Sequence, residues 1–306
     1  MDANPLMSSS PRPMPPNDDL RPLLIAGPTA SGKSAYALAE ASRRPSLIIN
    51  ADSMQVYKDL VLLTARPSAD DEARAPHALF GHVDGAIAYS TGVYMRDIAP
   101  VLAAANANGM RPIIVGGTGP YFKALLEGLS PVPAIPDVIR MHWRAEAARM
   151  GAAGLHDELR RRDPGMADRL RPTDPQRITR ALEVLEATGQ SLSVWQATPG
   201  TPLLDEGACE RVVIQPERAT LYARADARFD RMVAEGAIEE VAALAARKLG
   251  ADLPAMRALG VPEITAYLAG EMPLEDAIAR AKLETRRYIK RQLTWLSRNM
   301  SAWKHI

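Results

Sequence analysis

Short runs of apolar residues recur along the chain, separated by stretches whose apolar positions follow a helical spacing. The runs lie at 23–26, 47–50, 113–115 and 212–214. Helical stretches follow at about 33–41 and 91–108. Continuous apolar strands that alternate with helices predict a parallel sheet covered by helices on both faces. We therefore expect an α/β core, and we expect the chain after residue 213 to be helical to its end.

The segment between the third and fourth apolar runs differs from the rest in composition and is predicted to be a mostly helical insertion. Residues 140–180 carry ten Arg and six Asp or Glu. Asp174 as N-cap, Pro175 at the first helical position and Gly189 as terminator predict one of its helices. The expected boundaries are 21–130 and 209–306 for the core domain and 131–208 for the insertion domain.

Composition places the chain among ordinary globular proteins. Its 306 residues, 47% of them hydrophobic and 24% charged, suffice for a core domain with one insertion. The net charge of +1 predicts no partner by itself. A single cysteine, Cys209, excludes a disulfide framework and a cysteine-based zinc site.

The first residues and the length of the apolar runs bear on location. Residues 1–20 contain five prolines and no apolar segment of the kind found in secretory signals, so we expect a disordered tail. No run of 18 apolar residues occurs, so we expect no membrane span. The lone cysteine suits a reducing compartment, and we expect a cytoplasmic protein.

A glycine-rich motif follows the first apolar run and indicates a phosphate site. It matches G-x-x-x-x-G-K-[ST] between a strand and a helix, a context that disfavours a chance match. Backbone N–H groups of such a loop converge on phosphate oxygens, with Lys33 at the outer phosphate and Ser34 as a ligand of Mg²⁺. The motif predicts a P-loop NTPase-like core. Its members are Gly27, Pro28, Thr29, Ala30, Ser31, Gly32, Lys33 and Ser34.

The residues that follow the other strands indicate what this loop does with its phosphates. Phosphoryl transfer favours a strand-end Asp that helps to hold the metal, but the third run ends in Gly116-Gly117-Thr118. The one strand-end acid is Asp52, which precedes the polar residues Ser53 and Gln55. We therefore expect the loop to hold a diphosphate as a leaving group. A turn or helix-capping role for Asp52 is the alternative.

Two arginines after the fourth run offer a second contact to a diphosphate. Arg224 and Arg228 are four residues apart and share one helix face. Guanidinium groups in that arrangement can bind phosphate oxygens bidentately. The alternative is a solvated face on which Asp226 pairs with the arginines.

Two helical segments carry an excess of basic residues. One begins at Asp174, where Gln176, Arg177 and Arg180 lie away from the apolar positions of the helix. The other is 280–306, which holds eight Lys or Arg and one acid, with aromatic residues between them. Basic groups neutralise nucleic-acid phosphates, and aromatic or Gln side chains can stack on or read bases. A charge-rich face that only contacts water is the alternative.

Several of these motifs occur together, in one order, in a known family. They are Gly27–Ser34, 50–57 (Asn-Ala-Asp-Ser-Met-Gln-Val-Tyr), 116–119 (Gly-Gly-Thr-Gly), 174–183 (Asp-Pro-Gln-Arg-Ile-Thr-Arg-Ala-Leu-Glu) and 290–295 (Lys-Arg-Gln-Leu-Thr-Trp). Over residues 22–298 the chain resembles the tRNA dimethylallyltransferases. The resemblance implies that the exocyclic amine of the adenosine 3′ to the anticodon attacks dimethylallyl diphosphate, and that diphosphate leaves.

The resemblance also implies roles for residues. Asp52 is then the general base, Thr118 contacts the flipped adenosine, and Lys33 and Arg224 act on the diphosphate with Mg²⁺. The expected partners are dimethylallyl diphosphate and the anticodon stem-loop of tRNA, gripped in part by the insertion, and we expect a monomer. The implied tRNA contacts are Asp52, Ser53, Met54, Gln55, Thr118, Arg140, Gln176, Arg177, Ile178, Thr179, Arg180, Lys290, Arg291, Gln292, Thr294 and Trp295.

Three other functions stay open on the residues alone. Prenylation of free AMP or ATP uses the same chemistry, but it leaves the insertion and the basic C-terminal helix without a role. A small-molecule kinase needs an acid or a set of lid arginines after the third strand, and 116–119 supplies neither. A nucleic-acid-binding protein with a P-loop switch leaves Asp52 unexplained.

Overall fold

The computed structural model describes residues 20–306, which divide into two compact units. The first unit comprises the described residues up to Lys123 together with Leu204–Ile306, and the second comprises Ala124–Leu203. The second unit overlaps the expected insertion domain at 131–208, but it begins before residue 131 and ends before residue 208. The expected disordered tail lies outside the described residues, apart from Leu20.

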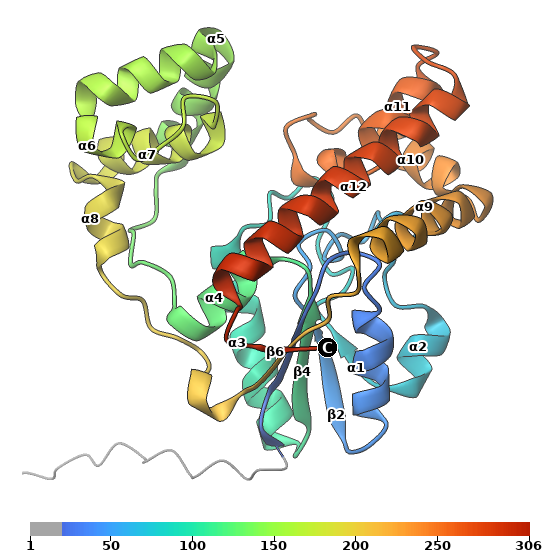
Figure 1. The fold of residues 1–306 in the computed structure, drawn as a ribbon. Coiled ribbons are helices and arrows are strands. Elements are labelled where there is room, and N and C mark those ends of the chain that lie inside the picture. Colours follow the sequence, from blue (N-terminus) through green and yellow to red (C-terminus); the bar gives the residue numbers. More distant parts are fainter. Residues whose placement is uncertain (1–19) are drawn as a thin grey trace, which may run out of the picture. The chain divides into compact units, whose positions relative to one another are not determined.

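A single parallel sheet forms the centre of the first unit (Figure 1). Its strand order is β3-β2-β4-β1-β5-β6, and every neighbouring pair is parallel, which confirms the expected α/β core. The central strands match the four apolar runs to within two residues at each end. The strands are β1 (Leu23–Ala26), β2 (Ser46–Asn50), β3 (His77–Ala78), β4 (Arg111–Gly116), β5 (Glu210–Val213) and β6 (Lys304–His305).

The two edge strands were not expected from the sequence. The expectation that the chain is helical from residue 213 to its end is wrong at Lys304–His305, which pair with Val212 and Val213 of β5. Both β3 and β6 have only two residues, and β6 is exposed. Main-chain pairing rather than an apolar pattern defines them, so nothing in the hydropathy of the chain marks them.

Helices cover both faces of this sheet, as the alternation of strands and helices predicted. Helix α1 (Lys33–Ala41) buries Ala37 and Leu38 against alternate residues of the strands, among them Ile25 and Ile113. Helix α3 (Thr91–Ala107) packs against β4 on the other face (Figure 1). The P-loop between β1 and α1 is thereby fixed at both of its ends.

A group of helices lies beyond the carboxyl ends of the central strands (Figure 1). Helices α9 and α12 pack on each other through a buried cluster of Leu221, Ala225 and Ile289, and Ala30 of the P-loop contacts the same cluster. The remaining elements of this unit are α2 (Ala69–Arg74), α4 (Gly119–Glu127, which continues into the second unit), η2 (Glu206–Ala208), α9 (Arg218–Ala234), α10 (Ala237–Ala246), η3 (Pro254–Arg257), α11 (Val261–Leu268) and α12 (Leu274–Asn299).

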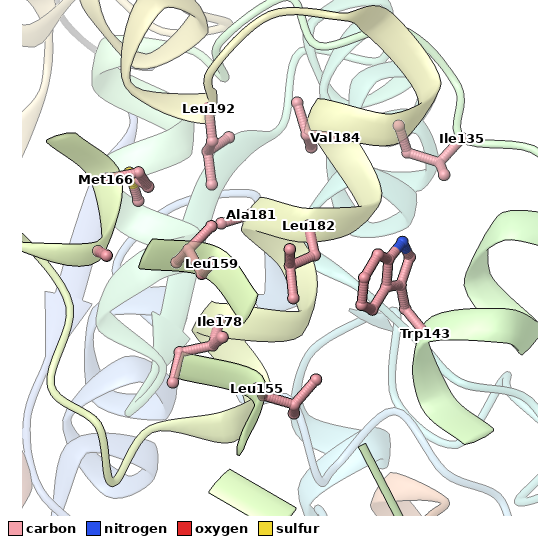
Figure 2. Close-up of a cluster of buried hydrophobic side chains, with 11 residues drawn as sticks. Ile135, Trp143, Leu155, Leu159, Met166, Ile178, Ala181, Leu182, Val184 and Leu192 are labelled. Carbon is pink, nitrogen blue, oxygen red and sulfur yellow. The ribbon is translucent and has the colours of Figure 1, made fainter. Parts of the chain in front are cut away.

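The second unit is helical and has its own core. It consists of α5 (Asp137–Arg162), α6 (Pro164–Ala167), α7 (Pro175–Thr188) and α8 (Leu192–Ala197). Figure 2 shows Trp143, Leu155 and Leu159 of α5 packed around Ile178 and Leu182 of α7. The caps expected for α7 are confirmed. The Asp174 side chain accepts the Arg177 N–H, and Gly189 ends the helix in a left-handed conformation with a φ of 68°.

In residues 20–306, no helix combines the length and the apolar character that crossing a membrane requires.

Candidate active site

The P-loop is held in a conformation that suits an anion. A Cβ at Gly27 would lie 2.7 Å from the carbonyl oxygen of Ile214, so the start of the loop has no room for a side chain. Gly32 caps α1 with a φ of 94°, in the left-handed region that favours glycine. The loop therefore delivers the N-terminus of α1, with its free N–H groups, to the surface of a cleft.

The side chain of Lys33 folds back over this loop, and its environment disfavours the charged form of its amine. Its Nζ donates to the carbonyl oxygen of Pro28 at 3.3 Å. The pKa of Lys33 is lowered to about 8, chiefly by burial; the negative charge of Asp52 opposes this shift and the positive charge of Arg228 adds to it. An anion bound beside the amine would stabilise its charged form, so the free site is built to receive negative charge.

A cleft of about 700 Å³ opens in front of the loop, and the charged residues that line it are mainly cations among small side chains. Its one acid, Asp71, forms a capping box with Ser68 at the start of α2, so that carboxylate is already engaged. An excess of positive charge around a helix N-terminus fits a di- or triphosphate. The cationic side chains that line it are Lys33, Arg66, Arg224, Arg228 and Arg231.

The two arginines expected to clamp a diphosphate differ in their positions. Arg224 is exposed on the wall of the cleft, whereas Arg228 is half-buried and donates to the Thr29 hydroxyl of the P-loop. Asp226 does not neutralise either one, because its Oδ2 lies 3.3 Å from Nη1 of Arg286. The pairing of Asp226 with these arginines, which the alternative required, is not found, and Arg224 and Arg228 both line the cleft.

Asp52 lies at the end of β2, in a loop that is ordered by amide side chains. Asn50 accepts the Asp52 N–H at 2.8 Å and donates to the Asp52 carbonyl at 2.9 Å. The Oδ1 of Asp52 accepts the Met54 N–H at 3.0 Å, which is the turn role considered as an alternative. Its other oxygen, Oδ2, would be 3.5 Å from a Cβ at Gly117 and so faces the loop after β4.

Thr118 is joined to the Asp52 loop. Its Oγ1 accepts the Ser53 N–H at 2.9 Å and donates to the Ser53 hydroxyl at 3.2 Å. The Thr118 N–H in turn donates to the carbonyl oxygen of Ala51 at 3.1 Å. The structure therefore brings together Asp52 and Thr118, which the sequence placed after different strands.

Two tyrosines, the buried Tyr121 and the partly buried Tyr288, also belong to the surroundings of Asp52. Burial raises the pKa of Tyr121 and of Tyr288, and the charge of Asp52 raises both further. Both phenols therefore stay protonated around neutral pH and can donate hydrogen bonds. Neither tyrosine was among the expected site residues. Tyr288 stood out only as an aromatic residue among basic ones.

The residues expected to bind tRNA on α12 separate into two sets. Gln292 points into the unit and is buried. Its Oε1 accepts the Thr29 N–H at 3.0 Å, and its Nε2 donates to the Gly117 carbonyl at 3.1 Å. The other expected residues of this helix line a separate hollow of about 360 Å³. They are Lys290, Arg291, Thr294 and Trp295, and Arg298 and Asn299 complete the lining.

The expected tRNA residues of the second unit are mostly at its surface. Arg140 lies 3.8 Å from Asp137, and Gln176 is exposed. Ile178 is the exception: its side chain is fully buried in the helical core, so a contact between that side chain and RNA is excluded. Helix α7 presents to solvent Gln176, Arg177 and, in part, Thr179 and Arg180.

The cleft offers one side chain suited to Mg²⁺ beside bound phosphate. Ser34 is exposed at the start of α1, on the lining of the cleft. Among residues 20–306 there is no group of three or more His, Cys, Asp or Glu side chains that could hold a metal ion. Mg²⁺ keeps several waters and binds through few protein groups plus phosphate, so the Ser34 hydroxyl fits this ion.

The chain is similar in sequence to the members of one protein family. The IPP transferase family model matches residues 55–299. A tRNA dimethylallyltransferase of Azorhizobium caulinodans is 53% identical over 289 residues, covering 94% of this chain and 93% of that protein. One from Methylocella silvestris is 54% identical over 273 residues, covering 89% of this chain and 90% of that protein.

Two solved structures are also similar. The full-length tRNA isopentenylpyrophosphate transferase of Bacillus halodurans has a TM-score of 0.66 and 32% identity, and the match covers 94% of this chain and 89% of that one. A eukaryotic dimethylallyltransferase, captured acting on tRNA, has a TM-score of 0.77 and 26% identity. That match covers 90% of this chain and 69% of the eukaryotic one.

Proposed function

The chain belongs to the IPP transferase family, and from that premise we propose that it transfers a dimethylallyl group to tRNA. The donor is dimethylallyl diphosphate. The acceptor is N6 of the adenosine on the 3′ side of the anticodon, in tRNAs that read codons starting with U. The observation that carries the proposal is that the P-loop adjoins a carboxylate: a Cβ at Gly117 would lie 3.4 Å from the carbonyl oxygen of Gly27 and 3.5 Å from Oδ2 of Asp52.

The cationic cleft suits diphosphate as a leaving group. When the bond between C1 of the dimethylallyl group and its diphosphate oxygen breaks, negative charge grows on that oxygen. Lys33, Arg224 and Arg228 stabilise this charge from positions set before the reaction. The N–H groups at the start of α1 act in the same direction.

Mg²⁺ belongs to the proposal, with Ser34 as its protein ligand. When bound, it supplies charge neutralisation to the diphosphate.

Asp52 and Thr118 form the acceptor side of the proposed site. The adenosine leaves its stack so that N6 can approach the reacting carbon. As the new C–N bond forms, the amine loses a proton, which Asp52 accepts at Oδ2. Thr118 contacts the adenosine, and its hydrogen bonds to Ser53 hold its side chain against the Asp52 loop.

The surface residues of α12 and of the second unit are the proposed tRNA contacts. Lys290 and Arg291 offer positive charge beside the Trp295 ring, a combination that suits a nucleic-acid backbone with adjacent bases. Arg140, Gln176, Arg177 and the exposed parts of Thr179 and Arg180 would grip the anticodon stem-loop. The chain acts as a monomer in the cytoplasm.

A transfer assay tests this function. Purified protein is mixed with Mg²⁺, dimethylallyl diphosphate and an unmodified tRNA that reads U-starting codons, and the digested tRNA is analysed by mass spectrometry for dimethylallyladenosine. A matched tRNA with guanosine at the target position is the control and should stay unmodified. Product on AMP with none on tRNA would favour the free-nucleotide prenyltransferase, and ATP-dependent phosphorylation without prenylation would favour the kinase.

A further inference from the structure

Gln292 has surroundings unlike those of its neighbours on α12. It is only 7% exposed, and its carboxamide makes one hydrogen bond at each end. The acceptor end takes the Thr29 N–H at 3.0 Å, and the donor end reaches the Gly117 carbonyl at 3.1 Å. The carboxamide is therefore engaged at both ends and largely shielded from solvent.

The two hydrogen bonds join the two loops that carry the proposed chemistry. Thr29 belongs to the P-loop after β1, and Gly117 to the loop after β4 that also carries Thr118. Strands β1 and β4 are paired as far as Ala26 and Gly116, so the sheet fixes both loops only up to that point. Beyond it, Gln292 bridges one loop to the other through a single side chain.

Close packing supports the bridge on both sides. A Cβ at Gly117 would overlap the Gln292 amide, and one at Gly119 would overlap the Trp295 ring. Thr29 is also gripped twice: its N–H donates to Gln292 on α12, and its hydroxyl accepts from Arg228 on α9. Because α9 and α12 share a buried cluster, these contacts form one connected support under the P-loop.

We propose that Gln292 is a positioning residue that sets the spacing between the diphosphate loop and the Thr118 loop, and that it is not a tRNA ligand. The inference rests on the proposed function for its catalytic consequence. The binding of diphosphate to the P-loop can be measured separately. The hollow lined by Lys290, Arg291 and Thr294 then lies on a different face of α12 from the one through which Gln292 supports the diphosphate loop.

The test compares Gln292→Met with the wild type. Met has a similar length but offers neither hydrogen bond, so both loops lose the bridge. Calorimetry with inorganic pyrophosphate and Mg²⁺ should give a Kd about tenfold weaker, in line with two lost hydrogen bonds of ordinary strength. The Kd for tRNA should stay within about twofold of the wild type. Gln196→Met, at an exposed position on α8, is the matched control and should change neither value.

Steady-state kinetics separate positioning from a general loss of structure. We expect the KM for dimethylallyl diphosphate to rise about tenfold in Gln292→Met while the KM for tRNA is unchanged. A purely structural role would reduce the amount of active enzyme and so lower kcat with both KM values unchanged. Gln292→Asn keeps the carboxamide but is too short for both bonds. The pyrophosphate Kd and the KM for dimethylallyl diphosphate of Gln292→Asn should lie between those of the wild type and those of Gln292→Met. If Gln292→Met does not fold, Gln292→Asn tests the proposal by the same criteria.

These experiments distinguish a failure of the proposed function from a failure of the positioning role of Gln292. If the wild type binds pyrophosphate but does not prenylate tRNA, the proposed function fails, and the calorimetric comparison still tests Gln292. If Gln292→Met binds pyrophosphate as the wild type does, the positioning role is overturned. A simultaneous loss of tRNA affinity would then make Gln292 a tRNA ligand.

Discussion

Lys33 should make the free protein less stable while making it a better receptor for anions. Its pKa falls from 10.5 to about 8, chiefly because its ammonium group is buried. At about 1.4 kcal/mol for each pH unit, this burial corresponds to roughly 3 kcal/mol against the charged form in the folded protein. Replacing Lys33 with Met removes the buried charge and keeps the apolar stem.

We therefore expect Lys33→Met to raise the free energy of unfolding by about 1–3 kcal/mol at pH 7. Between the folded pKa near 8 and the ordinary value of 10.5, the unfolded wild type binds more protons than the folded one. Wild-type stability must then rise with pH across that interval, relative to the variant. The advantage of Lys33→Met should accordingly shrink as the pH increases from 7 to about 10.

Urea unfolding of both proteins at several pH values measures this difference directly. Lys304→Met, at an exposed position in β6, is the control and should leave the stability unchanged. In the same samples, Lys33→Met should bind pyrophosphate at least tenfold more weakly, because a charge-assisted contact is lost. If Lys33→Met is less stable than the wild type at pH 7, or if its advantage does not change with pH, the reasoning about a strained buried amine is refuted.

Four further predictions concern other parts of the molecule. Asp52→Asn should retain tRNA affinity yet lower the single-turnover rate by two or more orders of magnitude, and an unchanged rate would remove Asp52 as the base. Arg228→Met should weaken pyrophosphate binding by about tenfold in calorimetry, whereas equal affinity would place the guanidinium outside the site. Lys290→Gln combined with Arg291→Gln should lower the salt slope of tRNA binding by about 0.7 per lost phosphate contact, and a constant slope would exclude that surface. Ile178→Ala should destabilise the second unit by about 2–4 kcal/mol in urea unfolding and leave the pyrophosphate Kd unchanged; a loss of tRNA affinity without loss of stability would contradict its place in the core.

The parts of the fold that could be predicted are those encoded by residues close together in the sequence. Strands β1, β2 and β4 are buried on both faces and therefore appear as continuous apolar runs, and the P-loop motif spans adjacent residues. The caps of α7 are local as well. By contrast, β3 and β6 exist through pairing with distant strands, and a two-residue strand leaves no periodicity to detect.

The candidate site was predicted unevenly for a related reason. Helix spacing put Arg224 and Arg228 on one face, but only the packing of α9 beside the P-loop shows that Arg228 reaches Thr29. Gln292 could have been recognised from the sequence. It follows Ile289 by three residues and precedes Leu296 by four, which places it in the buried stripe of α12. The run of basic neighbours drew attention to charge instead of to that spacing.

The long sequence separations within the cleft have a consequence for how the protein is made. The hydrogen bond between Thr29 and Gln292 closes a separation of 263 residues, and the one between Thr29 and Arg228 closes 199. During synthesis the P-loop leaves the ribosome before the helices α9 and α12 that support it. The nascent chain thus carries an incomplete anion site until α12 has been made, while the second unit, with its contiguous sequence, can fold before the core closes.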